Sequence, residues 1–151
     1  MTGDSSQAGE KSSQIDLTVA DLDQPSTLKT FKADVEVIEP GFARIRYPFN
    51  LDWCNPRGSL QGGMFAVFLD EVMGYAMIGS HPKLDTLWTT TSLNVNYLRP
   101  VTGEVIAEGR VIREGSRTVY LEGEILTAEG KLAAKGTSTM LLLRRDGELL
   151  K

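Results

Sequence analysis

Two adjacent carboxylates, Asp70 and Glu71, lie near the middle of the longest apolar run of the chain, Gly62 to Ser80. An ionised carboxylate buried without a partner costs on the order of several kcal/mol, so a chain that keeps one in such a segment is expected to use it. A carboxylate held away from water is a stronger base or nucleophile than one in water. Proton abstraction or attack on an electrophile is therefore the chemistry to consider.

Asp70 and Glu71 are not expected to serve one site together. An α-helix rotates by about 100° per residue, so neighbouring side chains point in different directions. Without further pattern, a salt bridge at an interface explains Asp70 as well as catalysis does. For Glu71 two alternatives are open: pairing with a cation, or a place at a subunit interface. The glycine pair that begins the run, Gly62-Gly63, indicates by itself only a turn or a helix N-terminus.

Composition limits the classes of protein. With 151 residues, 41% of them hydrophobic, the chain is sized for one domain with its own core. The net charge of -4 and the absence of a basic run argue against nucleic acid as a partner. The charges at the centre of the apolar run argue against a membrane span. The single cysteine and the lack of a secretory pattern predict a cytoplasmic protein.

Metal and histidine chemistry have little support in the sequence. The one histidine, His81, and the one cysteine, Cys54, cannot assemble a zinc cluster. His81 precedes Pro82 in an expected loop, so we interpret it as an exposed loop side chain rather than part of a catalytic triad.

Turn signals divide the chain into short elements. Residues 1–14 are polar and rich in Ser and Gly, which predicts a disordered tail ahead of a single domain over residues 15–151. The next residues allow a short helix over Thr18–Leu22 that ends near Pro25. Alternating apolar residues around Glu39-Pro40-Gly41 predict a hairpin, and four later segments predict a meander. The expected strands cover Phe31–Val37, Gly41–Pro48, Trp88–Leu98, Glu104–Arg113, Thr118–Thr127 and Leu132–Arg144.

The apolar run Gly62–Ser80 has to share one core with these strands. Because it is apolar on nearly every face, a helix there must be covered almost all round. Short turns favour antiparallel pairing. A strongly curved antiparallel sheet wrapped around the helix meets this need, and a second copy of the sheet can cover what one leaves open. The sequence therefore predicts an α+β chain with the hotdog fold, a curved antiparallel sheet of about six strands around one long central helix.

The segment from Asn55 to Asp70 resembles the signature of PaaI-type hotdog acyl-CoA thioesterases, which include 4-hydroxybenzoyl-CoA and phenylacetyl-CoA thioesterase-like proteins. In that family an Asn or Gln opens the motif, His-Gly-Gly follows six residues later, and an Asp or Glu lies nine residues after the His. Asn55, Gln61 and Asp70 have this spacing. The likeness extends over roughly Val35 to Leu142, including the Asn-Tyr-Leu-Arg-Pro sequence of Thr90–Pro100. Gln61 departs from the pattern, because it stands where the family has His.

The resemblance implies hydrolysis of an acyl-CoA thioester, with coenzyme A as part of the substrate and no separate cofactor or metal. Asp70 resembles the family's catalytic carboxylate, which acts either as nucleophile or as the base that activates water. Gly62 resembles the residue whose backbone N–H polarises the thioester oxygen, a task that suits a helix N-terminus. Asn55 resembles the group that orients the water or the thioester. Thr90 aligns with a hydroxyl that assists the water in some relatives.

Further residues are expected on the substrate side of the site. Gln61 and Gly63 belong to the motif loop, and Gln61 is expected to hold that loop by hydrogen bonds in place of the family's His. Arg99, Arg117 and Arg57 are candidates for the phosphates of coenzyme A. Arg117 is favoured, because its turn resembles a region that often contacts this part of the substrate in relatives.

The resemblance also implies an active site between two subunits of a homodimer, with a dimer of dimers as the expected tetramer. The expected partner is the acyl-CoA substrate, with neither nucleic acid nor membrane. One alternative is a non-catalytic hotdog protein that binds acyl-CoA or acyl-carrier thioesters, which the substitution by Gln61 motivates. Dehydration or hydration of an acyl chain ranks last, because it requires a histidine near an acid and His81 lies outside the motif.

Overall fold

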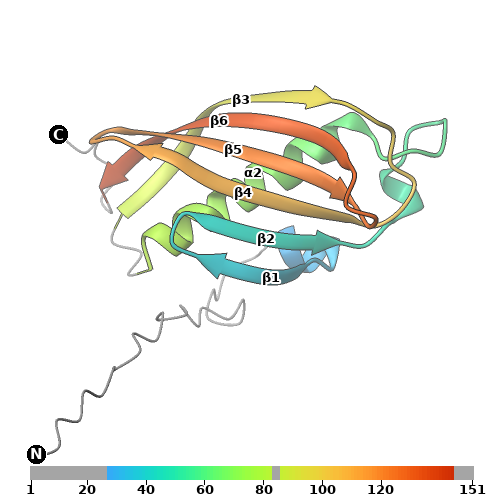
Figure 1. The fold of residues 1–151 in the computed structure, drawn as a ribbon, viewed down its shortest axis with the longest axis horizontal. Coiled ribbons are helices and arrows are strands. Elements are labelled where there is room, and N and C mark those ends of the chain that lie inside the picture. The colour runs from blue at the N-terminus through green and yellow to red at the C-terminus, as the bar shows by residue number, and fades with distance from the viewer. Residues whose placement is uncertain (1–26, 83–85, 145–151) are drawn as a thin grey trace, which may run out of the picture.

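The computed structural model describes residues 27–82 and 86–144, which form a six-stranded antiparallel sheet around one long helix (Figure 1). The strands lie in the order β1-β2-β4-β5-β6-β3. The hotdog fold predicted from the sequence is confirmed. The strands are β1 (Asp34–Glu39), β2 (Phe42–Tyr47), β3 (Thr86–Tyr97), β4 (Val105–Glu114), β5 (Thr118–Thr127) and β6 (Leu132–Arg144), and the helices are α1 (Thr27–Phe31), the 3-10 turn η2 (Leu51–Trp53) and α2 (Gly62–Ser80).

The predicted strand boundaries agree with the structure to within two residues, except at the start of the first strand. Phe31 ends α1 and β1 begins at Asp34, so the predicted strand Phe31–Val37 is wrong in its first residues. α1 ends where the Ala33 N–H donates to the Leu28 carbonyl (2.9 Å) and Lys32 takes a φ of 50°, which turns the chain into β1. An apolar residue such as Phe31 fits a helix face as well as a strand face. The predicted tail over residues 1–14 and the predicted helix over residues 18–22 lie outside the described residues.

A row of three glycines lets α2 lie directly on the sheet. Gly109 on β4 pairs with Gly123 on β5, which pairs with Gly136 on β6. A Cβ added at Gly109 would lie 2.7 Å from the Val72 carbonyl oxygen, and one at Gly123 or Gly136 would lie 2.8 or 2.9 Å from the Leu69 side chain. Any side chain in this row would push the helix away from the sheet. The row therefore sets the depth at which α2 and its carboxylates lie.

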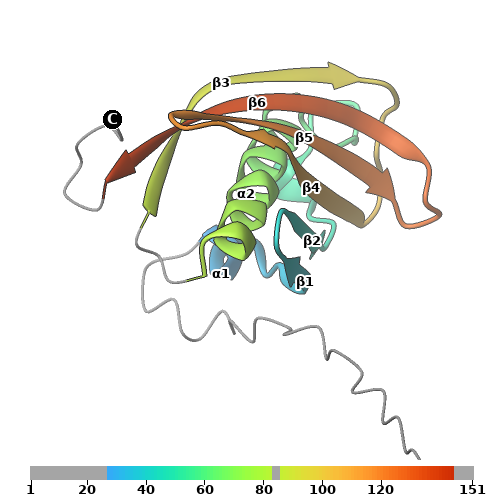
Figure 2. The same cartoon turned by 60° about the vertical axis from the view of Figure 1, so that its left-hand side comes forward.

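α2 is the core helix of the domain, although one chain does not cover it completely. Its length and apolar composition would suit a membrane span, but half of it is buried inside the protein. Figure 2 shows the sheet arching over the helix. The helix packs mainly against β4 and β2. Gly63, Val67 and Asp70 stay exposed, so the expectation of a helix covered almost all round is met only in part within one chain.

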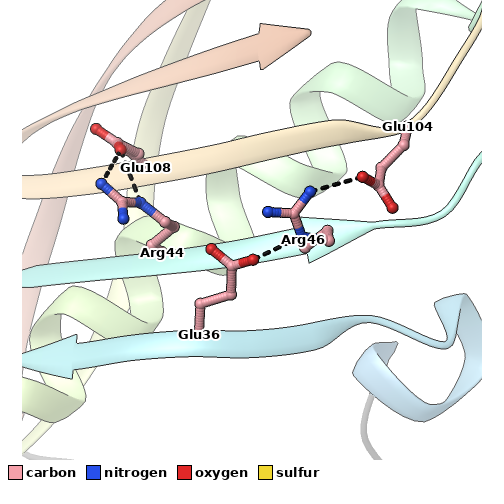
Figure 3. A network of polar contacts seen from close by, with 5 residues as sticks. All are labelled: Glu36, Arg44, Arg46, Glu104 and Glu108. Carbon is pink, nitrogen blue, oxygen red and sulfur yellow. Dashed lines mark hydrogen bonds and ion pairs between the residues drawn. The ribbon is translucent and has the colours of Figure 1, made fainter. Parts of the chain in front are cut away.

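The outer face of the sheet, away from α2, carries ion pairs that join neighbouring strands (Figure 3). Arg46 on β2 contacts Glu36 on β1 and Glu104, each at 2.6 Å. Arg44 contacts Glu108 on β4 at 2.7 Å, and Glu108 is only 8% exposed. The two ion pairs of Arg46 are partly exposed, and such pairs contribute about 0–1 kcal/mol each. These charges join neighbouring strands of the sheet on the face opposite α2.

Candidate active site

The loop that leads into α2 is organised by Asn55. The Asn55 Oδ1 accepts a hydrogen bond from the Arg57 N–H, and its Nδ2 donates to the Ser59 Oγ, both at 2.9 Å. The Ser59 carbonyl in turn accepts from the Asn55 N–H at 2.8 Å. An asparagine amide donates and accepts at once, which suits this turn. Asn55 therefore shapes the motif loop in addition to the orienting role that the sequence predicts for it.

The first turn of α2 presents an unused backbone donor. Gln61 is the N-cap, and its Oε1 accepts from the Gly63 N–H at 2.6 Å. The glutamine thus makes a loop-fixing hydrogen bond of the kind expected of it. The Gly62 N–H makes no hydrogen bond to any residue within 27–82 or 86–144. A Cβ at Gly62 would meet nothing closer than the Tyr97 ring at 3.5 Å, so the packing of this chain does not require glycine there.

An open cleft of about 320 Å³ is lined in part by Gly62, the residue that carries this donor. The partial positive charge at a helix N-terminus and a free N–H favour an oxygen that gains negative charge. The cleft is otherwise mostly apolar, which suits an uncharged acyl group. Its lining residues are Asn55, Ser59, Leu60, Gly62, Phe65, Tyr97, Leu98, Arg99 and Pro100.

Asp70 and Thr90, both predicted site residues, are brought together by the structure. The Thr90 hydroxyl on β3 donates to the Asp70 Oδ1 at 2.8 Å. The Asp70 side chain is exposed, whereas its apolar surroundings in the sequence suggested burial. The reason is the position of α2, which lies over β4 and β2 and leaves its other side open. Asp70 is thus accessible to a ligand or to a second subunit.

Glu71 has a different environment and is already engaged. The Tyr47 hydroxyl donates to its Oε2 at 2.7 Å, and the Thr27 hydroxyl donates to its Oε1. Tyr47 is fully buried; burial and the Glu71 charge raise the pKa of Tyr47 far above its usual range. Its hydrogen-bond partners among residues 27–82 and 86–144 are hydroxyl groups, and the two alternatives left open by the sequence, a cation and a subunit interface, stay predictions. Glu71 links α1 and β2 to α2 and is not free for chemistry.

Gly62 and Asp70 are separated along the helix that carries both. Eight residues at 1.5 Å each place them about 12 Å apart along the axis. Two hydrogen bonds join α2 to β3 at these points: Tyr97 Oη to the Gly62 carbonyl (3.1 Å) and Thr90 to Asp70. One chain therefore presents the backbone donor and the carboxylate as two separate points. The Tyr97 bond is a feature that sequence reasoning missed, because an aromatic residue at a strand end indicates only packing.

Two of the three arginines considered for phosphate binding lie at different ends of the sheet. Arg99 lines the cleft of Gly62, and its Nε donates to the Leu132 carbonyl at 2.8 Å. Arg117 follows the turn between β4 and β5, and lines a separate cleft of about 330 Å³ together with Arg113. This turn lies near the end of α2 (Figure 1). Within one chain, Arg117 is not brought together with Gly62.

His81 is not the exposed loop side chain that the sequence suggested. It is the C-cap of α2, where its N–H donates to the Met77 carbonyl at 2.9 Å. Its Nε2 lies 2.9 Å from the Glu114 Oε1, and its ring packs near Trp88. This places His81 at the opposite end of α2 from Gly62, outside the candidate site. Among the residues that the structure describes, no group of three or more His, Cys, Asp or Glu side chains is arranged to hold a metal ion.

Comparisons with known proteins show the family of this chain. Residues 57–134, just over half of the chain, match the family model described as thioesterase superfamily. A Saccharolobus solfataricus protein, named provisionally as an esterase, is 33% identical over 114 residues, which cover 74% of this chain and 80% of the relative.

Solved structures extend the likeness over most of the fold. A conserved protein from Pseudomonas aeruginosa superposes with a TM-score of 0.75 at 29% identity, covering 83% of this chain and all of that one. The Escherichia coli PaaI protein from the phenylacetic acid degradation operon superposes with a TM-score of 0.74 at 20% identity, covering 85% of this chain and 91% of that one. This chain therefore belongs to the thioesterase superfamily.

Proposed function

We propose that this protein hydrolyses an acyl-CoA thioester to a free acid and coenzyme A. Family membership supports thioester hydrolysis in general. The observation that carries the narrower proposal is the Gly62 N–H at the start of α2, which has no partner within residues 27–82 and 86–144. Gly62 lines a mostly apolar cleft, and an exposed carboxylate lies on the same helix. A donor for a developing oxyanion and a group that attacks or activates water are the two parts that thioester hydrolysis needs.

In the proposed reaction Asp70 takes a proton from water while the water oxygen attacks the thioester carbon. The carbonyl oxygen gains negative charge and accepts a hydrogen bond from the Gly62 N–H. Collapse of this intermediate expels the coenzyme A thiolate, which takes up a proton. Direct attack by Asp70, followed by hydrolysis of the anhydride, leads to the same products. Thr90 donates to one Asp70 oxygen, which keeps the carboxylate oriented and leaves its other oxygen for the reaction.

The separation of Asp70 from Gly62 leads us to place the site between two subunits. β3 is the last strand of the sheet order and has twelve residues, so one long edge offers unpaired backbone groups. A two-fold axis that pairs β3 with its own copy also sets the two α2 helices antiparallel. Asp70 would then lie near Gly62 of the partner subunit. Pairing in this way would also cover the side of α2 that one chain leaves exposed.

The same arrangement favours Arg117 over Arg99 as the phosphate contact. In an antiparallel pair of helices, the turn between β4 and β5 lies at the end where the partner's α2 begins. Arg113 and Arg117 share the cleft at this turn with the hydroxyls of Ser116 and Thr118. Guanidinium and hydroxyl groups together suit the phosphates of coenzyme A. Arg117 would therefore bind the nucleotide part of a substrate whose thioester lies at Asp70.

The test is release of coenzyme A, measured with a thiol-reactive dye, from short, long and aromatic acyl-CoAs. We expect Asp70→Asn to lower turnover by at least about a hundredfold, and Thr90→Val by about tenfold, because the first removes the base and the second only its orienting partner. Asp52→Asn is the matched control, because Asp52 is also exposed but lies in η2.

Two results would contradict this proposal. If Asp70→Asn turned over substrate like the wild type, Asp70 would have no part in the mechanism. If the wild type released no coenzyme A from any member of the panel but bound the thioesters, the protein would be a binding module. Gln61 is the feature that favours this second candidate, because its amide cannot titrate where the family has a histidine.

A further inference from the structure

We infer that Tyr97 is a positioning residue that fixes the direction of the Gly62 N–H, an inference that rests on the proposed function. The Tyr97 hydroxyl donates to the Gly62 carbonyl at 3.1 Å. Its ring carbons and hydroxyl lie 3.5 Å from the place where a Cβ at Gly62 would stand. Tyr97 thus contacts the first residue of α2, a residue that lines the cleft and whose N–H has no partner among residues 27–82 and 86–144.

Core packing does not account for the hydroxyl of Tyr97. The residue is 56% exposed, and its ring meets Phe65 edge to face, with centroids 5.6 Å apart. A phenylalanine would make the same ring contact. The part that tyrosine adds is the O–H group, whose only partner among residues 27–82 and 86–144 is the Gly62 carbonyl. The hydroxyl therefore acts on the backbone of the helix start.

The peptide group between Gly62 and Gly63 is held by side-chain hydrogen bonds at both of its polar atoms. Between Gly62 and Gly63, the carbonyl accepts from Tyr97 and the N–H donates to the Gln61 Oε1 at 2.6 Å. Two consecutive glycines have more backbone freedom than any other pair, and the ends of helices fray. With this peptide held at both polar atoms, the preceding N–H, that of Gly62, keeps one direction. A donor that is already oriented stabilises an oxyanion without reorganisation during the reaction.

Tyr97 is itself held by the sheet. Directly after it, the Leu98 and Arg99 N–H groups both donate to the Ala133 carbonyl, at 2.8 and 3.1 Å. Tyr97 therefore fixes the Gly62 donor relative to β3. The same strand carries Thr90, and its free edge is the one that we propose for pairing. A change at β3 would reach the donor through a single hydrogen bond.

The test compares Tyr97→Phe with the wild type. We expect kcat to fall about three- to tenfold with KM unchanged, since one ordinary hydrogen bond is lost and the donor acts mainly on the transition state. With isotope-labelled glycine, we expect the amide resonances of Gly62 and Gly63 to shift and the Gly63 amide to exchange faster with solvent. Thr91→Val is the matched control, because it removes a hydroxyl-to-carbonyl bond from β3 that goes to Thr139 and not to α2.

The outcomes separate this inference from the proposed function. An unchanged kcat in Tyr97→Phe, or glycine amides that do not respond, would overturn it, as would equal effects from Thr91→Val. If the wild type has no thioesterase activity, the proposed function fails. Glycine amides that still respond to Tyr97→Phe would then show a purely structural hydrogen bond and would overturn its role in positioning a catalytic donor.

Discussion

The separation of Gly62 and Asp70 along α2 makes a quantitative prediction about mixed dimers. About 12 Å of helix lies between the two residues, so one thioester carbonyl cannot contact both within one chain. The perturbation is a pair of single variants, Asp70→Asn and Gly62→Val, each expected to be inactive alone. A valine at position 62 would add a branched side chain to a residue that lines the cleft, while its Cβ makes only ordinary contact with Tyr97.

The expected recovery follows from counting sites. If each site takes Asp70 from one subunit and Gly62 from the other, a mixed dimer has one intact site and one doubly altered site. Random exchange of an equal mixture makes about half of the dimers mixed, which gives about a quarter of wild-type activity. If both residues acted within one chain, the mixture would stay inactive.

The matched control carries both substitutions on one chain and is mixed with wild-type chains. A shared site predicts about a quarter of the activity of an equal total amount of wild-type protein, because every mixed dimer then has two damaged sites. A site within one chain predicts about half. Two different affinity tags would isolate the mixed dimers and show that exchange took place. Inactive, verified mixed dimers of the two single variants would refute the shared site, and with it the two-fold arrangement along β3.

Two further predictions concern stability. Burial and the Glu71 charge raise the pKa of Tyr47, so the folded protein keeps the Tyr47 proton above pH 10, where the unfolded chain loses it. The free energy of unfolding should therefore fall as pH rises beyond about 10, by up to about 1.4 kcal/mol per pH unit. Urea unfolding of Tyr47→Phe should lack this part of the fall. Identical alkaline slopes would contradict this assignment. Gly109→Ala should lower the free energy of unfolding by about 1–3 kcal/mol, because its Cβ would lie 2.7 Å from the Val72 carbonyl oxygen. The control Gly103→Ala, whose Cβ would meet nothing within 4 Å, should change it by less than about 0.5 kcal/mol. Equal changes in the two variants would refute the packing argument.

The sequence predicted most helices and strands because the residues that begin and end them lie within or next to each element. The glycine pair at position 62 and the loss of apolar residues after Ser80 bound α2, and the strand limits follow turn residues such as Gly41, whose φ is 75°. Phe31 was misplaced because an apolar side chain suits either a helix or a strand. Its choice of α1 depends on aromatic neighbours from β2, η2 and α2, all of which are later in the chain.

The sequence by itself determined which residues could form a site: a carboxylate, a glycine at a helix start and an asparagine, at fixed spacing along one segment. Only the tertiary structure decided which carboxylate is free. Hydroxyls from α1 and β2 hold Glu71, while Asp70 faces the open side and meets Thr90 from β3. The contact of Tyr97 with Gly62 is equally non-local. Such contacts depend on where strands that are distant in sequence pass the helix, and the spacing of residues along the chain does not predict this.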